Sequence, residues 1–196
     1  RIRQQVRALV GAGYEVTVIC PKGKKQGGYE VVDGARVYRY PTPAQGDGLL
    51  GYLWEYGYSL VAAFLVSLLV FFRHGFDVIH THNPPDVPVL IAAFYKLFGK
   101  RFVYDHHDLA PEMYYARFSG QGNPMVYKAL LLFEKLSCKL ADHIIATNYS
   151  YKTLEVERHG VAPERITIAR NGPELDRLRP VEADPELRKK AKNIIC

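Results

Sequence analysis

The sequence contains little cysteine, and its cysteines are not paired. Cys20, Cys138 and Cys196 lie far apart, and the 196 residues contain no C-x-x-C pair. This distribution argues against a disulfide framework and against a structural zinc site, and it fits a reducing compartment. We therefore expect a cytoplasmic protein.

No continuous hydrophobic run has the length of a membrane span. The longest, Leu60 to Phe72, is broken only by Ser67 and falls short of the roughly 20 apolar residues that a spanning helix needs. We expect residues 49–75, which contain this run, to form a core helix that covers a sheet. Because Trp54 and several tyrosines precede the run and Arg73 follows it, peripheral contact with the inner face of the cell membrane is the alternative.

The positive charge is not arranged for nucleic-acid binding. The net charge is +6, and the densest basic runs are KGKK at 22–25 and RKKAK at 188–192. These runs carry no interleaved aromatic residues that could stack on bases, so we expect no nucleic-acid partner. The hydrophobic content of 48% predicts a packed core rather than disorder.

Both ends of the sequence have the pattern of a chain interior. Ile2, Val6 and Leu9 fall on one face of a helix that begins with the first residues. In an α/β fold a strand usually precedes such a helix. The final residues, NIIC at 193–196, begin like a strand. We therefore expect an internal piece of a longer protein, with the first strand of its sheet missing.

Between the ends, short β-branched runs alternate with helical patterns. The expected strands are EVTVIC, YEVV, ARVYRY, FDVIH, RFVYD, DHIIAT and RITIA, and the expected helices are 86–98, 124–141 and 149–159. Asp33-Gly34 predicts a hairpin turn between YEVV and ARVYRY. The alternation predicts an α/β fold with a doubly wound, mostly parallel, Rossmann-like sheet.

Two histidine-rich turns follow two of these strands. FDVIHTHNPPD places His80 and His82 at the end of one strand, and FVYDHHDLAPE places His106 and His107 at the end of another. In a doubly wound sheet, ligands bind at the carboxyl ends of the strands. We expect His80 to pack against the sheet, and the role of His106 is open.

The second turn favours a site for hydroxyl-rich ligands. An imidazole beside a carboxylate, as in His107-Asp108, is suited to hydrogen-bonding hydroxyls or to moving protons. Asn83 and Glu112 supply further hydrogen-bonding groups. The alternative is a metal-dependent hydrolase that uses the His80, His82, His107 and Asp108 side chains as ligands, although the related barrel enzymes draw further ligands from later strands.

Five motifs in order carry a resemblance to a known family. They are GAGYEVTVICP, DVIHTHNP, DHHDLAPE, DHIIATN and IARNGPELDRLRP. Together they resemble the N-terminal half of a family 4 retaining glycosyltransferase of the GT-B fold. Such enzymes have two Rossmann-like domains, of which the N-terminal one usually holds the acceptor. The resemblance implies an acceptor-side domain at 1–178, followed at 179–196 by a linker and the start of a nucleotide-sugar-binding domain.

The resemblance also assigns roles to individual residues. It implies that His107 is the catalytic residue at the reacting centre. The implied acceptor-binding residues are His82, Asn83, Asp108 and Glu112. The implied donor-binding residues are Asn171 and Gly172.

The implied activity is transfer of a hexose-type sugar from a nucleoside diphosphate sugar to an acceptor hydroxyl, with retention of configuration. Cell-surface polysaccharide or glycolipid synthesis is the expected setting, with a sugar or lipid-linked acceptor and without a metal or other cofactor. The E-x7-E motif of the family belongs to the donor domain, so we expect this chain alone to be inactive. The alternative is a non-catalytic acceptor-binding or membrane-recruiting subunit of a split glycosyltransferase.

Overall fold

The computed structural model describes residues 1–44, 48–170, 172 and 185–190. The expected domain boundary after residue 178 lies outside these residues. The strands are β1 (Thr17–Pro21), β2 (Tyr29–Val32), β3 (Ala35–Tyr40), β4 (Val78–His82), β5 (Arg101–His106), β6 (His143–Ala146) and β7 (Ile166–Ile168). The helices are α1 (Ile2–Gly11), α2 (Gly48–His74), α3 (Val89–Lys96), α4 (Ala110–Arg117), α5 (Pro124–Leu140), α6 (Tyr149–His159) and α7 (Pro185–Lys190), with a 3-10 turn at Pro163–Arg165.

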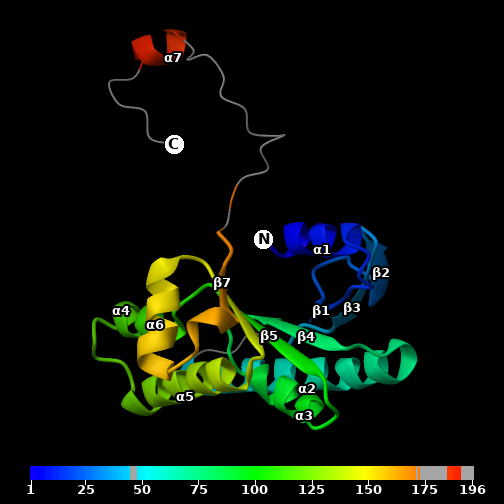
Figure 1. The fold of residues 1–196 in the computed structure, drawn as a ribbon. Helices are drawn as coiled ribbons and strands as arrows, with labels where there is room; N and C mark the ends of the chain where they lie inside the picture. Colours follow the sequence, from blue (N-terminus) through cyan, green and yellow to red (C-terminus); the bar gives the residue numbers. More distant parts are fainter. Residues whose placement is uncertain (45–47, 171, 173–184, 191–196) are drawn as a thin grey trace.

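The described strands form two sheets (Figure 1). The smaller sheet has the order β1-β3-β2, with β1 parallel and β2 antiparallel to β3. The larger sheet has the order β4-β5-β6-β7, and all of its pairs are parallel. The α/β fold with a mostly parallel sheet is therefore confirmed.

The hairpin of the smaller sheet forms as the sequence predicts. Asp33 and Gly34 both have positive φ, at 50° and 82°, which is the backbone that a two-residue hairpin turn with right-handed strand twist requires. A Cβ atom at Gly34 would lie 2.8 Å from Cγ1 of Val10 on α1. Glycine is needed here both for its conformation and for the close approach of α1.

The main core lies between the larger sheet and its helices. Phe102 and Tyr104 of β5 are buried with Ile144 of β6, and Ala92 of α3 and Cys138 of α5 pack against them. Alternate residues of β5 therefore face this core, because successive side chains of a strand point to opposite faces. Cys20 and Cys138 are free thiols, and burial raises the pKa of Cys138 above its usual value.

Three helices differ from the sequence expectation, and one of them is α7, which lies where a linker and the start of a strand were expected. α3 is shorter than the expected 86–98, since it begins only after Pro88, and Asp86 instead accepts a hydrogen bond from the Tyr104 hydroxyl at 2.5 Å. α4 was not predicted at all. It is short and lacks an apolar stripe, so its pattern is hard to distinguish from a loop; only Pro111 is buried in it.

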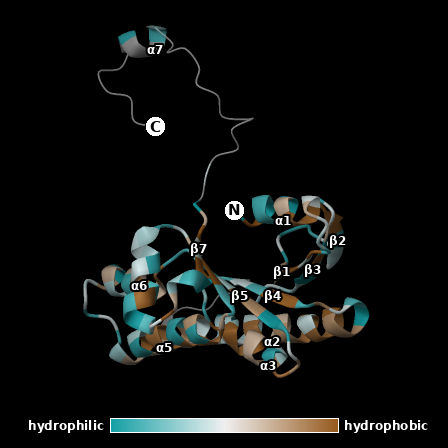
Figure 2. Cartoon of the chain, in the orientation of Figure 1, coloured by the Kyte–Doolittle hydropathy of each residue, from teal (hydrophilic) through white to brown (hydrophobic). Residues whose placement is uncertain are grey.

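α2 is a helix as expected, but one of its faces is uncovered. On its inner side, Phe64 contacts Phe94 of α3, and the Ser67 and Tyr95 hydroxyls are hydrogen-bonded at 2.9 Å. The opposite face exposes Val61, Leu65, Leu69 and Phe72, and Figure 2 shows apolar residues along most of the helix. The expectation of a helix buried in the core is wrong for this face.

By length and composition alone, Gly51–His74 of α2 is long and apolar enough to cross a membrane. The continuous apolar run from Leu60 to Phe72 is shorter and did not suggest this. Only 11% of its most apolar window is buried.

Asp142 is expected to stabilise the larger sheet more than an exposed ion pair does. Its carboxylate receives two 2.8 Å hydrogen bonds from Lys96 and one of 2.7 Å from the amide of Phe102. Asp142→Ala should lower the free energy of unfolding by about 1–2 kcal/mol, measured by urea denaturation. Asp77→Ala is the matched control, because Asp77 is 98% exposed and 3.5 Å from Lys100, and it should change stability by less than about 0.5 kcal/mol. Equal effects of the two substitutions would contradict the prediction.

Candidate functional site

The site is built where β4 and β5 end side by side. The two strands are parallel, and their register pairs His82 with Asp105. The amide of Asn83 continues the ladder by donating to the carbonyl of Asp105 at 3.2 Å. The two histidine-rich turns, far apart in the sequence, are therefore neighbours.

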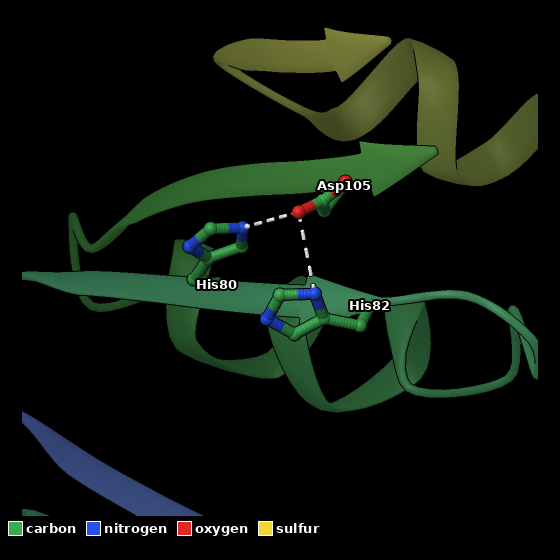
Figure 3. A group of neighbouring side chains, drawn as sticks. All are labelled: His80, His82 and Asp105. Atoms are coloured by element: carbon green, nitrogen blue, oxygen red, sulfur yellow. Dashed lines mark ion pairs between the residues drawn. The ribbon is translucent and has the colours of Figure 1, made fainter. Parts of the chain in front are cut away.

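The carboxylate of Asp105 is the centre of this site (Figure 3). Asp105 is fully buried, and His80 Nε2 and His82 Nδ1 lie 3.6 and 3.3 Å from its Oδ2 atom. His107 Nδ1 lies 3.4 Å from Oδ1. The expectation that His80 packs into the sheet is wrong, because His80 and His82 are two residues apart on one face of β4 and their rings stack at 4.6 Å.

The carboxylate that faces His107 is thus Asp105 and not its sequence neighbour Asp108. The sequence did not single out Asp105 because it ends a strand that reads as buried. Only the register of β4 against β5, which no local pattern encodes, places it opposite His82.

Arg1 and the helix α1 that follows it supply further partners to the same carboxylate. Nη2 of Arg1 donates to Oδ1 at 2.5 Å, and the Gln5 amide donates to Oδ2 at 2.6 Å. Burial alone would raise the pKa of Asp105, but the three imidazoles and Arg1 hold it far below its usual value. Burial lowers the pKa of His82 despite the nearby carboxylate, so this imidazole is mainly neutral at pH 7.

Asn83 fixes the turn that carries His107. Its side chain is buried, and its Oδ1 atom accepts from the amides of His107 at 2.8 Å and Asp108 at 3.2 Å. Its Nδ2 atom donates to the carbonyl of Asp108 at 2.5 Å. The side chain of Asn83 therefore makes three hydrogen bonds to backbone groups of the neighbouring turn.

His106, whose role the sequence left open, points to the opposite side of β5. It is fully buried, with Nδ1 2.9 Å from Oε1 of Glu155 on α6 and Nε2 3.8 Å from Oε2 of Glu134 on α5. Glu134 also contacts His159 at 2.6 Å and accepts from Arg158 at 3.0 Å. Burial would raise the pKa of Glu134, but the bond to His159 and the charges of His106 and Arg158 keep it below its usual value.

The predicted site residues not yet described are Asp108, Glu112, Asn171 and Gly172. Asp108 is partly buried at the start of the turn, and Glu112 on α4 forms an ion pair with Arg158. Gly172 is exposed, and Asn171 lies outside the described residues. The structure therefore gathers His82, Asn83, His107 and Asp108 at the strand ends.

The arrangement is chemically suited to binding polyols. The imidazole of His107 has one nitrogen directed at a carboxylate, which orients the ring and leaves Nε2 for a ligand. Among the described residues, the His80, His82 and Asp105 ligand atoms also lie within 4.8 Å of one another, a spacing compatible with a metal ion.

Comparisons with known proteins concern the family and the fold of this chain. A family model described as "Glycosyl transferase 4-like domain" matches residues 1–172. The chain is 29% identical over 100 residues to the chitobiosyldiphosphodolichol beta-mannosyltransferase of Candida glabrata, which covers 50% of this chain. That stretch spans only 22% of the relative's length.

The structural comparison supports the fold. A sucrose-phosphate synthase from Thermosynechococcus elongatus superposes with a TM-score of 0.63 at 16% identity, covering 90% of this chain and 86% of that one. At this identity the likeness concerns the fold alone.

The Asn83 side chain is expected to hold the His107 turn rigid. Asn83→Ala should increase the hydrogen exchange of the His107 and Asp108 amides by at least about tenfold, because both lose a buried acceptor. Asn148→Ala is the matched control, because Asn148 caps α6 by accepting from the Tyr151 amide at 3.0 Å, and it should leave the exchange of the His107 and Asp108 amides unchanged. Exchange measured by NMR or mass spectrometry that is unchanged in Asn83→Ala would contradict this role.

Proposed function

Because the chain belongs to the family of glycosyl transferase 4-like domains, as its five motifs predicted, we propose that it is the acceptor-side half of a sugar-transferring enzyme. The donor is a nucleoside diphosphate sugar, and the acceptor is a hydroxyl of a sugar or of a lipid-linked saccharide. The supporting observation is the gathering of His82, His107 and Asp108 at the carboxyl ends of β4 and β5, where open α/β sheets bind ligands.

In this proposal His107 acts at the reacting centre. Nδ1 of His107 faces the Asp105 carboxylate at 3.4 Å, which leaves Nε2 to hydrogen-bond the sugar being transferred. His82 and Asp108 contact the acceptor, with Glu112 at the outer edge of the site, and Asn83 positions the turn. Asn171 and Gly172 remain proposed donor contacts.

The stereochemistry and the chemical setting are also proposals. We propose retention at the anomeric carbon, and departure of the nucleoside diphosphate with help from basic side chains and a helix N-terminus of a donor domain rather than from a metal. The name of the Candida glabrata relative records a beta-mannosyl product and a diphosphodolichol-linked acceptor. This supports a hexose donor and a lipid-linked acceptor, and we further propose polysaccharide or glycolipid synthesis at the cytoplasmic face of a membrane.

The uncovered face of α2 supports peripheral membrane contact. α2 packs lengthwise on the domain, through β1, β3 and the aromatic rings of α3, so the helix lies along the protein rather than leaving it. An apolar face held in this way fits the plane of a bilayer surface. Exposed Phe98, which follows α3, contacts Phe71 of α2, and Arg73 follows the apolar run with a charge suited to anionic headgroups.

Transfer should depend on His107. The full-length protein, given a panel of nucleoside diphosphate hexoses and a lipid-linked saccharide, should form a glycosylated product detected by mass spectrometry. His107→Ala should lower the rate by about 10²–10³-fold, the usual range for loss of one hydrogen-bond donor at a reacting centre. His143→Ala is the control, because His143 contacts Thr167 on β7 and should leave the rate unchanged.

The same assay tests the finer parts of the proposal. The anomeric configuration of the product, read by NMR, decides between retention and inversion. Residues 1–196 alone should give no product, since the proposed donor domain is a separate unit. Absence of transfer by the full-length protein with every donor would overturn the proposed function.

Membrane contact should be lost when the α2 face is made polar. The triple variant Leu65→Ser, Leu69→Ser, Phe72→Ser should bind vesicles of phosphatidylcholine and phosphatidylglycerol at least about tenfold more weakly, because each buried side chain contributes roughly 1.5 kcal/mol or more. Tyr149→Ser, which changes a 69% exposed residue on α6, should bind normally in co-sedimentation. Equal binding of both variants would exclude α2 as the contact.

A further inference from the structure

The ring nitrogens around Asp105 are directed at its carboxylate without forming hydrogen bonds. His80 Nε2, His82 Nδ1 and His107 Nδ1 are buried atoms, and none has a hydrogen-bond partner. A charge-assisted hydrogen bond between an imidazole and a carboxylate is about 2.7–2.9 Å long. The observed separations of 3.3 to 3.6 Å are too long for such bonds.

These separations match the spacing of ligands around a tetrahedral metal ion. Zinc binds histidine nitrogen at about 2.0–2.1 Å and carboxylate oxygen at about 2.0–2.2 Å, which places neighbouring ligand atoms about 3.4 Å apart. Oδ2 of Asp105 lies 3.6 Å from His80 Nε2 and 3.3 Å from His82 Nδ1 (Figure 3). The three ligand atoms lie within 4.8 Å of one another.

We propose that His80, His82 and Asp105 form a binding site for a divalent transition-metal ion, with zinc as the ion best suited to two imidazoles and one carboxylate. Three protein ligands leave a fourth position for water. The histidine side chains are 24% and 23% exposed but their ligand nitrogens are buried, so the side chains must shift slightly to admit an ion from solvent. This site goes beyond the proposed sugar transfer and does not depend on it.

The strands prearrange the ligands. His80 and His82 project from the same face of β4, and the β4–β5 register sets Asp105 beside His82. Ligands held on paired strands need little movement to close on an ion, because the backbone ladder fixes them.

The contacts from α1 set the strength of binding. Oδ2 accepts from Gln5 at 2.6 Å and from Nε of Arg1 at 3.3 Å, and these contacts are exchanged for the metal. Nη2 of Arg1 holds the other oxygen, Oδ1, at 2.5 Å and can remain as an outer partner of the ligating carboxylate. Because the guanidinium charge opposes a cation nearby, we expect a micromolar rather than a picomolar site.

Zinc titration of the full-length protein, stripped with chelator and competed against a chromophoric chelator, tests the proposal. The expected result is one zinc ion per chain, and intense visible absorption when cobalt replaces zinc, as a four-coordinate site gives. His80→Gln and His82→Gln should each weaken zinc binding by at least about tenfold. His143→Gln is the matched control, since it alters a histidine on another strand, and it should bind zinc normally.

The outcomes separate clearly. No stoichiometric zinc binding by the wild-type protein, or binding unchanged in both His80→Gln and His82→Gln, overturns the proposal. Thermal unfolding confirms that the two variants are folded, and Asp105 is left intact because α1 is tied to it. Zinc binding is measured without donor or acceptor and sugar transfer is measured with chelator present, so either proposal can fail without the other.

Discussion

The arrangement of this domain depends on the burial of one carboxylate. Moving an isolated charge out of water costs several kcal/mol unless other groups pair with it. Asp105 is fully buried at the end of β5, and its charge is compensated mainly by Arg1, the residue that precedes α1, while the histidines of β4 face the carboxylate from the neighbouring strand. The position of α1, the register of β4 and the orientation of His107 all meet this one requirement.

Successive side chains of β5 point to opposite sides of the sheet, so neighbouring residues of this strand serve two different purposes. Phe102, Tyr104 and His106 face the helices, where His106 joins the buried glutamates of α5 and α6. Asp105 and His107 face the site on the other side. A strand of period two thus lets adjacent histidines act as an internal support and as a solvent-accessible ligand contact.

The sequence predicted the local features well and the partners poorly. The β2–β3 hairpin was predicted to the residue because its turn is specified by Asp33-Gly34 alone. His107 was predicted as a site residue because its motif is local, and its catalytic role stays a prediction. Asp105 was missed because its histidine partners lie on β4, and the sequences of β4 and β5 do not by themselves determine the register in which the two strands pair. The uncovered face of α2 was missed because an apolar helix pattern shows what should be buried and not what covers it.

Glu134 and Glu155 illustrate the same limit. Each lies in an otherwise amphipathic helix, where a glutamate normally indicates the solvent side, yet both are fully buried against His106. No spacing within α5 or α6 signals this, since the reason lies at the end of a different strand.

The bond between Arg1 and Asp105 also joins the two sheets mechanically. α1 packs close to the hairpin of the smaller sheet, whereas Asp105 belongs to the larger one, so the bonds of Arg1 and Gln5 to its carboxylate span both halves of the fold. α2 joins the halves a second time, because it packs against β1 and β3 and against the aromatic rings of α3. A ligand that drew the guanidinium away from the carboxylate would therefore loosen one of these connections and leave the other in place.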